Sequence, residues 1–184
     1  MAFLAGQPND FRRAIALLRQ DLRSLWLAAF QSHLWNQILA DLIRQTCPPE
    51  QSACQVIGRR ELPFFVDLND SQRQQLHTTL LPLPSARLHL ETGPLQTLYE
   101  RALAAEGLEL RQVRVKYPRD SFFSKGERAA LFRPGDLTYE SAADDVYPGR
   151  YKLSLQFRLP RGSYATILMK RVTGQSGEEL ADED

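Results

Sequence analysis

The segment from Arg150 to Val172 constrains the fold most, because its hydrophobic pattern changes period in the middle. From Lys152 to Leu159, apolar and polar residues alternate strictly, which is typical of a strand with one buried face. The Pro-Arg-Gly sequence at residues 160–162 ends this strand. Ser163 is then a suitable N-cap for a short helix over residues 164–172. The segment therefore predicts a strand, a Gly-Ser turn and a helix in succession.

The predicted turn is a candidate anion-binding site. Free backbone N–H groups at a helix start, together with the helix dipole, can hold a phosphate or a carboxylate. Basic residues are frequent around the turn, and no Asp or Glu occurs between Val146 and Gly177. A polyanion such as RNA suits this pattern. The candidate contacts are Lys152, Arg158, Arg161, Gly162 and Ser163. The alternative is an ordinary strand–turn–helix whose exposed face is basic.

Composition narrows the class of protein. The 184 residues, 43% hydrophobic and 24% charged, suit one globular unit or two small lobes with a substantial core. The net charge is only +1, so binding to nucleic acid would require a local basic patch. The sequence contains no apolar run of membrane-spanning length and no recognisable signal peptide. Cys47 and Cys54 lack His or Cys neighbours for zinc. We expect a cytoplasmic protein with reduced thiols, no metal or cofactor, and no membrane partner.

A long amphipathic helix is predicted from an N-cap at Ser24 to about Gln45. Its apolar stripe contains Leu27, Phe30, Leu34, Trp35, Ile38, Leu39, Leu42 and Ile43, and we expect this face to be core. Gln31, Ser32 and Asn36 lie beside the stripe. Polar side chains in such a place need partners. They either bond to neighbouring backbone or contact a ligand.

Distant segments of the chain resemble signatures of the TruD-type tRNA pseudouridine synthases. Residues 157–172 resemble the family's C-terminal strand, roughly Phe-x-Leu-Pro-x-Gly-Ser-Phe/Tyr-Ala-Thr, and the helix after it. Residues 23–40 resemble the family helix that carries Ser-Ala-x-Gln/Arg-Ser-x-Leu-Phe/Trp-Asn. Residues 125–134 are similar to a family strand of the form Arg-Arg-x-Leu-x-x-x-Pro. The segments occur in the order that the family has.

The resemblance implies an enzyme that isomerises uridine in tRNA to pseudouridine without metal or cofactor, after the base has been extruded from its stack. It implies that Tyr164 stacks on the flipped uracil and that Gln31, Ser32 and Asn36 line the RNA-binding cleft. The alternative for Tyr164 is a core aromatic that holds the helix to the sheet.

The family's catalytic aspartate is missing from this sequence. Its motif has the form Gly-x-Lys-Asp-x-x-Ala-x-Thr-x-Gln, and the sequence contains no Lys-Asp pair. The nearest match, at Asp120, lacks the Ala, Thr and Gln that should follow. We therefore expect no catalytic residue in this chain and no activity from it alone. If the chain were active, Asp120 or Asp145 would be the candidates.

The resemblance covers only the C-terminal half of a family member. The chain is then either a truncated or split synthase, whose partner is the missing N-terminal half, or a stand-alone inactive module that binds RNA or protein. We expect an α+β fold in which two or three helices pack on a small, mostly antiparallel sheet containing residues 152–159. We expect residues 1–177 to form the synthase-like region, with a smaller insert lobe at about 50–125. We expect residues 178–184 to form an acidic, disordered tail.

Overall fold

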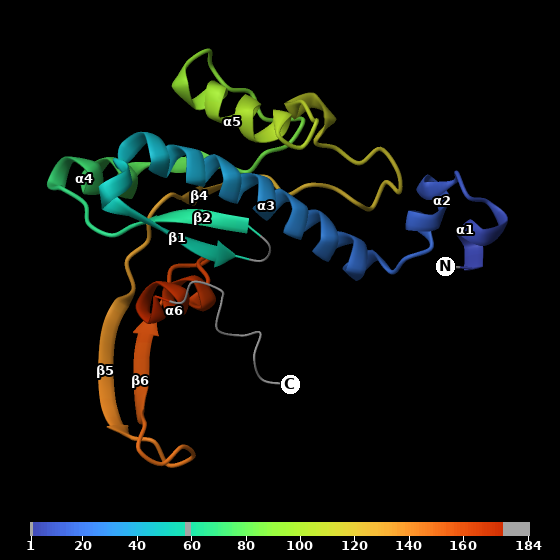
Figure 1. Cartoon of the computed structure of the whole chain (residues 1–184). Helices are drawn as coiled ribbons and strands as arrows, with labels where there is room; N and C mark the ends of the chain where they lie inside the picture. The colour runs from blue at the N-terminus through green and yellow to red at the C-terminus, as the bar shows by residue number, and fades with distance from the viewer. Residues whose placement is uncertain (1, 58–59, 175–184) are drawn as a thin grey trace.

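The computed structural model describes residues 2–57 and 60–174 (Figure 1). The helices are α1 (Ala2–Gly6), α2 (Phe11–Ala16), α3 (Gln20–Thr46), α4 (Asp70–Thr78), α5 (Pro94–Ala104) and α6 (Ala165–Thr173). The strands are β1 (Ser52–Ile57), β2 (Arg60–Phe65), β3 (Leu80–Pro82), β4 (Glu127–Ala129), β5 (Gly135–Ala143) and β6 (Tyr151–Arg158). Short 3-10 turns cover Pro49–Gln51 and Leu110–Gln112. This combination confirms the predicted α+β class. The predicted acidic tail lies outside the described residues.

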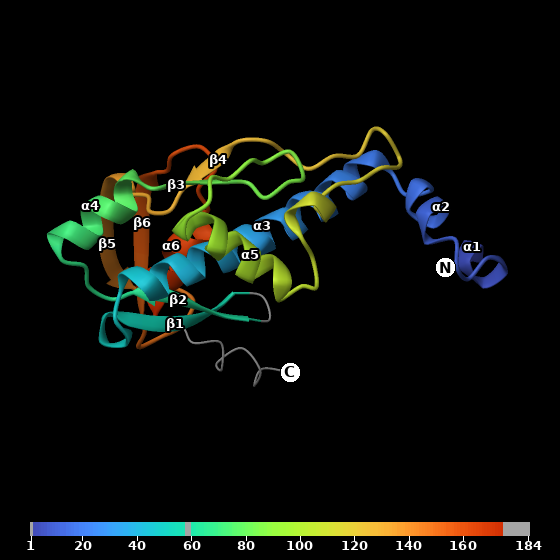
Figure 2. The same cartoon turned by 90° about the horizontal axis from the view of Figure 1, so that it is seen from above.

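Helix α3 is the central packing element of the described chain, with β2, β3 and α5 against it. Its 27 residues span about 40 Å at the usual rise per residue. Seen from above, the ribbons β1–β2 and β3–β4 lie on opposite sides of α3 (Figure 2). Most of the predicted stripe is buried or half-buried on this helix, with Leu34 and Ile38 fully enclosed. None of the helices in residues 2–57 and 60–174 is long and apolar enough to cross a membrane.

The start of α3 differs from the prediction. The helix begins at Gln20, and Ser24 lies inside it rather than at its N-cap. Arg23 donates hydrogen bonds back to the carbonyls of Ala16 and Leu18, which secures the turn before the helix. Asp21 places a negative charge at the positive end of the helix dipole. These interactions favour helix one turn earlier than the cap signal indicates.

The largest hydrophobic cluster joins α3 to β3 and α5. Its buried members are Trp35, Ile38, Leu81, Leu83, Leu98, Tyr99 and Ala102. The polar atoms of its two large aromatics are satisfied, since Trp35 Nε1 donates to the carbonyl of Leu81 at 3.0 Å and the Tyr99 hydroxyl to that of Pro82 at 2.5 Å. This cluster thus includes residues from the region 50–125. The predicted division of that region into a separate lobe stays a prediction.

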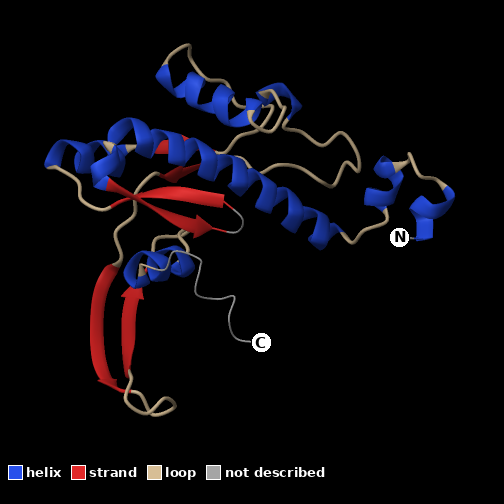
Figure 3. Cartoon of the chain, in the orientation of Figure 1, coloured by secondary structure: helices blue, strands red, loops and turns tan. Residues whose placement is uncertain are grey.

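The strands form three separate two-stranded antiparallel ribbons, β1–β2, β3–β4 and β5–β6. The prediction of one small sheet under the helices is therefore refined. Helix α3 packs on β2, whereas the hairpin β5–β6 extends away from α3 (Figure 3). In the described chain β6 pairs only with β5. The predicted buried face of this strand is consequently only half covered, and Leu153 remains 51% exposed.

The predicted strand, Gly-Ser turn and helix at the end of the chain are confirmed. Gly162 has a φ of 89°, a conformation that favours glycine, although a Cβ there would meet nothing within 4 Å. Ser163 is not the N-cap. Its N–H donates to the carbonyl of Pro160 within the turn, and Tyr164 occupies the N-cap position without a side-chain cap bond. Arg171 of α6 donates to the carbonyl of Val66 at 3.2 Å, which holds the helix to the ribbon β1–β2.

Candidate nucleic-acid interface

Arg128, on β4, lies in one of the three segments that resemble family signatures and contacts the other two. Its Nη1 donates to the hydroxyl of Ser32 on α3 at 3.2 Å. Its Cζ lies 5.7 Å from the ring centroid of Trp35 and 6.0 Å from that of Tyr164. Residues from distant parts of the chain therefore meet around one guanidinium. Sequence reasoning did not select Arg128 as a site residue, although it lies in the stretch 125–134 that resembles a family strand.

The position of Arg128 is fixed by local strand pairing. Its partner in the β3–β4 register is Leu81, whose carbonyl also accepts the indole N–H of Trp35. The pairing continues beyond the strand ends, because Leu83 N donates to Gly126 O at 2.8 Å and Ala130 N to Thr79 O at 2.9 Å. Both the backbone that carries Arg128 and the ring beside it are therefore held by the same short ribbon.

The three predicted residues of α3 have different surroundings. Gln31 is 2% exposed, and its Nε2 donates to the carbonyls of Pro84 at 3.0 Å and Ser124 at 2.8 Å. Its Oε1 accepts from the N–H of Ser124 at 3.2 Å. All its polar atoms are thus used within the chain, to bind two loops to α3. Ser32 is half-buried and contacts Arg128, and Asn36 lies one turn further along the same face of α3.

Tyr164 lies at the surface, with 55% of the residue exposed. Because α6 begins directly after it, the ring stands where the chain leaves the turn and enters the helix. The guanidinium of Arg128 lies over one face of the ring. A ring placed in this way has area available for stacking and a neighbouring positive charge.

The predicted basic contacts are spread along the hairpin. Lys152 Nζ lies 2.6 Å from the carboxylate of Asp145, and Arg158 Nε lies 3.2 Å from that of Asp136. The segment between Val146 and Gly177 contains no Asp or Glu, but its basic side chains still meet carboxylates, because β5 and the hairpin turn supply them. Lys152 and Arg158 are six residues apart on β6, about 20 Å along a strand. Arg161 is exposed in the turn before Tyr164.

The two aspartates considered as substitute catalytic groups both pair with cations. Asp120 lies 2.5 Å from the guanidinium of Arg23, which is 7% exposed and also donates to the Ser121 hydroxyl at 3.0 Å. Asp145 is at the hairpin turn, where the hydrogen bond from Lys152 holds its pKa below the usual range. In both cases the carboxylate is occupied by a structural partner.

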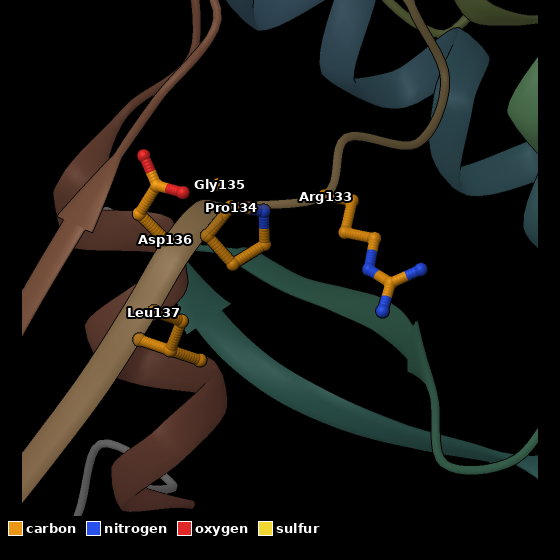
Figure 4. A pocket seen from close by; sticks show the side chains of 5 residues that line it. All are labelled: Arg133, Pro134, Gly135, Asp136 and Leu137. Carbon is orange, nitrogen blue, oxygen red and sulfur yellow. The ribbon is translucent and has the colours of Figure 1, made fainter.

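A hollow of about 710 Å³ lies where the chain passes from β4 into the hairpin (Figure 4). It is lined by Arg133, Pro134, Gly135, Asp136 and Leu137. In Figure 4 the side chains of Arg133 and Asp136 point in different directions, and Asp136 pairs with Arg158. The hollow thus contains no pair of groups arranged for acid–base chemistry. Nor do the described parts of the chain bring three His, Cys, Asp or Glu side chains together as a metal site.

Comparisons with known proteins agree with the signatures. The family model "tRNA pseudouridine synthase D (TruD)" matches residues 1–172. The "Probable tRNA pseudouridine synthase D 2" of Methanocaldococcus jannaschii is 28% identical over 164 residues, which cover 89% of this chain and 38% of that protein. The tRNA pseudouridine synthase D of Aquifex aeolicus is 25% identical over 165 residues, 89% of this chain and 40% of that protein.

A solved structure has the same fold. The crystal structure of a TruD protein from Methanosarcina mazei superposes with a TM-score of 0.64 at 20% identity, over 95% of this chain and 43% of that one. The chain therefore spans only about two fifths of the length of these relatives.

Proposed function

Because the chain belongs to the tRNA pseudouridine synthase D family, we propose that it is the RNA-binding, active-site-lining part of a synthase that isomerises uridine to pseudouridine in tRNA. The observation that carries this proposal is the meeting of Ser32 on α3 and Tyr164 before α6 at the guanidinium of Arg128. Two separate family signatures thereby contribute to one surface. The part corresponds to the C-terminal half of a family member.

In this proposal the chain holds the substrate rather than breaking the glycosidic bond. A uridine within folded RNA must leave its stack before an enzyme can reach it. The exposed ring of Tyr164 stacks on the extruded base, while Ser32, Asn36 and the basic residues Arg158 and Arg161 lie toward the RNA backbone. Gln31 supports this surface by fixing the loops at Pro84 and Ser124 to α3.

The catalytic aspartate is supplied by the part of the family architecture that this chain does not cover. The coverage of 38% to 43% of the relatives supports this division. The partner is then the N-terminal half, encoded with this chain or separately, and the complex acts on tRNA in the cytoplasm.

RNA binding tests the proposal directly. The chain should bind an unmodified tRNA transcript, and the affinity should fall steeply as salt rises, because phosphate contacts release counterions. Arg161→Glu should weaken binding. Arg101→Glu, on α5 and outside the proposed RNA-binding residues, should have a smaller effect. Affinity no greater than that of a neutral control protein would contradict the proposal.

The pure chain should not produce pseudouridine. Asp120 and Asp145 are engaged with Arg23 and Lys152, and no other residue matches the catalytic motif. A single-turnover assay on unmodified tRNA measures this, first with the chain alone and then with an added N-terminal half. Turnover by the chain alone would transfer the catalytic role to one of these aspartates.

A protein-interaction module is the second candidate, favoured by the exposed aromatic residues of the hairpin. It predicts no RNA affinity and no recovery of activity when the N-terminal half is added. The same two assays therefore separate the candidates.

A further inference from the structure

Arg128 is a half-buried residue, and its guanidinium has no carboxylate partner among the described residues. The described ion pairs involve other cations, and within the described residues the side chain of Arg128 donates one hydrogen bond, to the neutral hydroxyl of Ser32. Arg23 is a useful contrast, because its buried guanidinium is neutralised by Asp120. A partly desolvated charge without a counter-ion gains more from an anionic ligand than a solvated one does.

The side chain of Arg128 is also held in place before any ligand arrives. The rings of Trp35 and Tyr164 lie within 6.0 Å of its Cζ, and Ser32 occupies one N–H group. A guanidinium has five N–H donors in a rigid planar fork. The remaining donors are therefore available with little further loss of side-chain freedom. Phosphate oxygens match this fork with two parallel hydrogen bonds.

The turn before α6 is less suited to hold the anion than its sequence indicates. The N–H of Ser163 already donates to the carbonyl of Pro160 at 3.1 Å. One backbone donor of the turn is therefore used within the chain, whereas Arg128, whose Cζ lies 6.0 Å from the ring centroid of Tyr164, keeps N–H groups that bond to no described residue.

We propose that Arg128 is a phosphate-binding residue, which receives the phosphodiester group next to the base that stacks on Tyr164. This rests on the proposed RNA-binding function. Arg128 fixes the nucleotide by its backbone while Tyr164 holds the base, so that the two groups form a single nucleotide site. Ser32 acts through Arg128 as a positioning residue.

The test compares Arg128→Gln and Arg128→Lys with Arg101→Gln as the charge-matched control. Arg128→Gln should lower the affinity for an unmodified tRNA transcript by about tenfold to a hundredfold, the range of a charged hydrogen-bonded contact. It should also reduce the slope of log affinity against log salt concentration by about the amount that one phosphate contact contributes. Arg128→Lys should keep the salt slope but recover only part of the affinity, because it keeps the charge and loses the fork. Arg101→Gln should change neither quantity appreciably.

A small probe separates this site from the wider function. The wild-type chain should bind uridine 5′-monophosphate more tightly than uridine, and Arg128→Gln should abolish the difference. If tRNA binds but Arg128→Gln leaves its affinity and salt slope unchanged, the phosphate site is wrong and the proposed function stands. If tRNA does not bind but the nucleotide preference depends on Arg128, the site stands and the function is wrong. If neither the tRNA nor the nucleotide binds, both are wrong.

Ser32→Ala covers the case in which the Arg128 variants fail to fold. It leaves the charge of Arg128 in place and removes the hydroxyl that accepts its hydrogen bond, so it should weaken nucleotide binding by a smaller factor at an unchanged thermal midpoint. Unchanged nucleotide and tRNA binding in Ser32→Ala would contradict the positioning role.

Discussion

Gln31 and Ser32 are neighbours in the sequence with opposite surroundings. Gln31 is enclosed and bonded to the backbone of Pro84 and Ser124, while Ser32 faces the guanidinium of Arg128. Adjacent residues on a helix point about 100° apart, so one step in sequence moves from the core to the site. A set of polar residues beside an apolar stripe can therefore divide into members that support the fold, such as Gln31, and members that face the proposed site, such as Ser32.

Tyr164 allows stacking to be distinguished from packing. Tyr164→Ala should weaken tRNA binding by about 1–3 kcal/mol, the usual contribution of one stacked base. The thermal midpoint should change little, because 55% of the residue is exposed. Tyr164→Phe, which keeps the ring, is the matched control and should bind nearly as well as the wild type. A fall of many degrees in the midpoint, with Phe no better than Ala in binding, would make Tyr164 a structural residue.

At the scale of elements, an ionic contact joins three parts of the fold. Glu106 follows α5, and its Oε1 lies 3.0 Å from His33 Nε2 on α3 and 2.7 Å from Arg60 Nη2 on β2. The hydrogen bond with His33, followed by the charge of Arg60, lowers the pKa of Glu106, and burial opposes this only in part. The carboxylate form is therefore favoured in the folded chain.

The sign of the resulting pH dependence follows from linkage. A carboxyl with a lowered folded pKa contributes stability above its unfolded pKa of about 4.3 and loses it as the pH falls through the folded value. Glu106→Gln should therefore be less stable than the wild type at about pH 7, and the difference should shrink toward about pH 3. Urea unfolding across this range measures it, with Glu100→Gln, on α5 just before Glu106 in the sequence, as control. A difference that is independent of pH would exclude the ionic explanation.

Local patterns predicted the elements better than the contacts between them. The stripe of α3, the alternation of β6 and the turn at Gly162 all follow from sequence periods and turn chemistry, and the structure confirms these elements. The pairing of Arg23 with Asp120 joins residues 97 positions apart, and that of Arg128 with Ser32 joins residues 96 apart. No period connects such residues, because their proximity depends on how whole ribbons pack on α3.

The prediction that one face of β6 is buried was met only in part, for a related reason. Alternation shows that a strand has an apolar face, but it does not say whether the same chain covers that face. In the described structure Leu153 lies on a ribbon of two strands, with no third strand beside it. Similarly, no sequence pattern indicated that Arg158 has an acidic partner, whereas the structure brings Asp136 of β5 to 3.2 Å from its guanidinium.

At the scale of the whole molecule, the hairpin β5–β6 has one distinctly apolar face. The register places Tyr139 opposite Leu155, Ser141 opposite Leu153 and Ala143 opposite Tyr151, so these side chains share a face. Tyr139 is 77% and Tyr151 80% exposed. The other face carries polar residues such as Gln156 and Ser154. An isolated two-stranded hairpin is only marginally stable in water.

Tyr139→Lys should reduce the binding of an apolar fluorescent dye and the tendency to self-associate at high concentration. The thermal midpoint should stay nearly constant, because the side chain has little packing to lose. Thr138→Lys is the matched control, since it adds the same charge to the opposite face of the same strand. Equal effects of the two substitutions on dye binding would show that charge, rather than the apolar face, controls these properties.

The length of α3 and the projection of the hairpin affect the hydrodynamic behaviour of the chain. A compact domain of this length would have a radius of gyration of about 16 Å. Here a helix of about 40 Å carries α1 and α2 at one end, and a hairpin projects from the body (Figure 1). Friction rises with such extension at constant mass, so a monomer should elute early from a gel-filtration column and sediment slowly. An apparent dimer judged by elution volume alone would then be a single elongated chain, and light scattering, which reports mass, distinguishes the two.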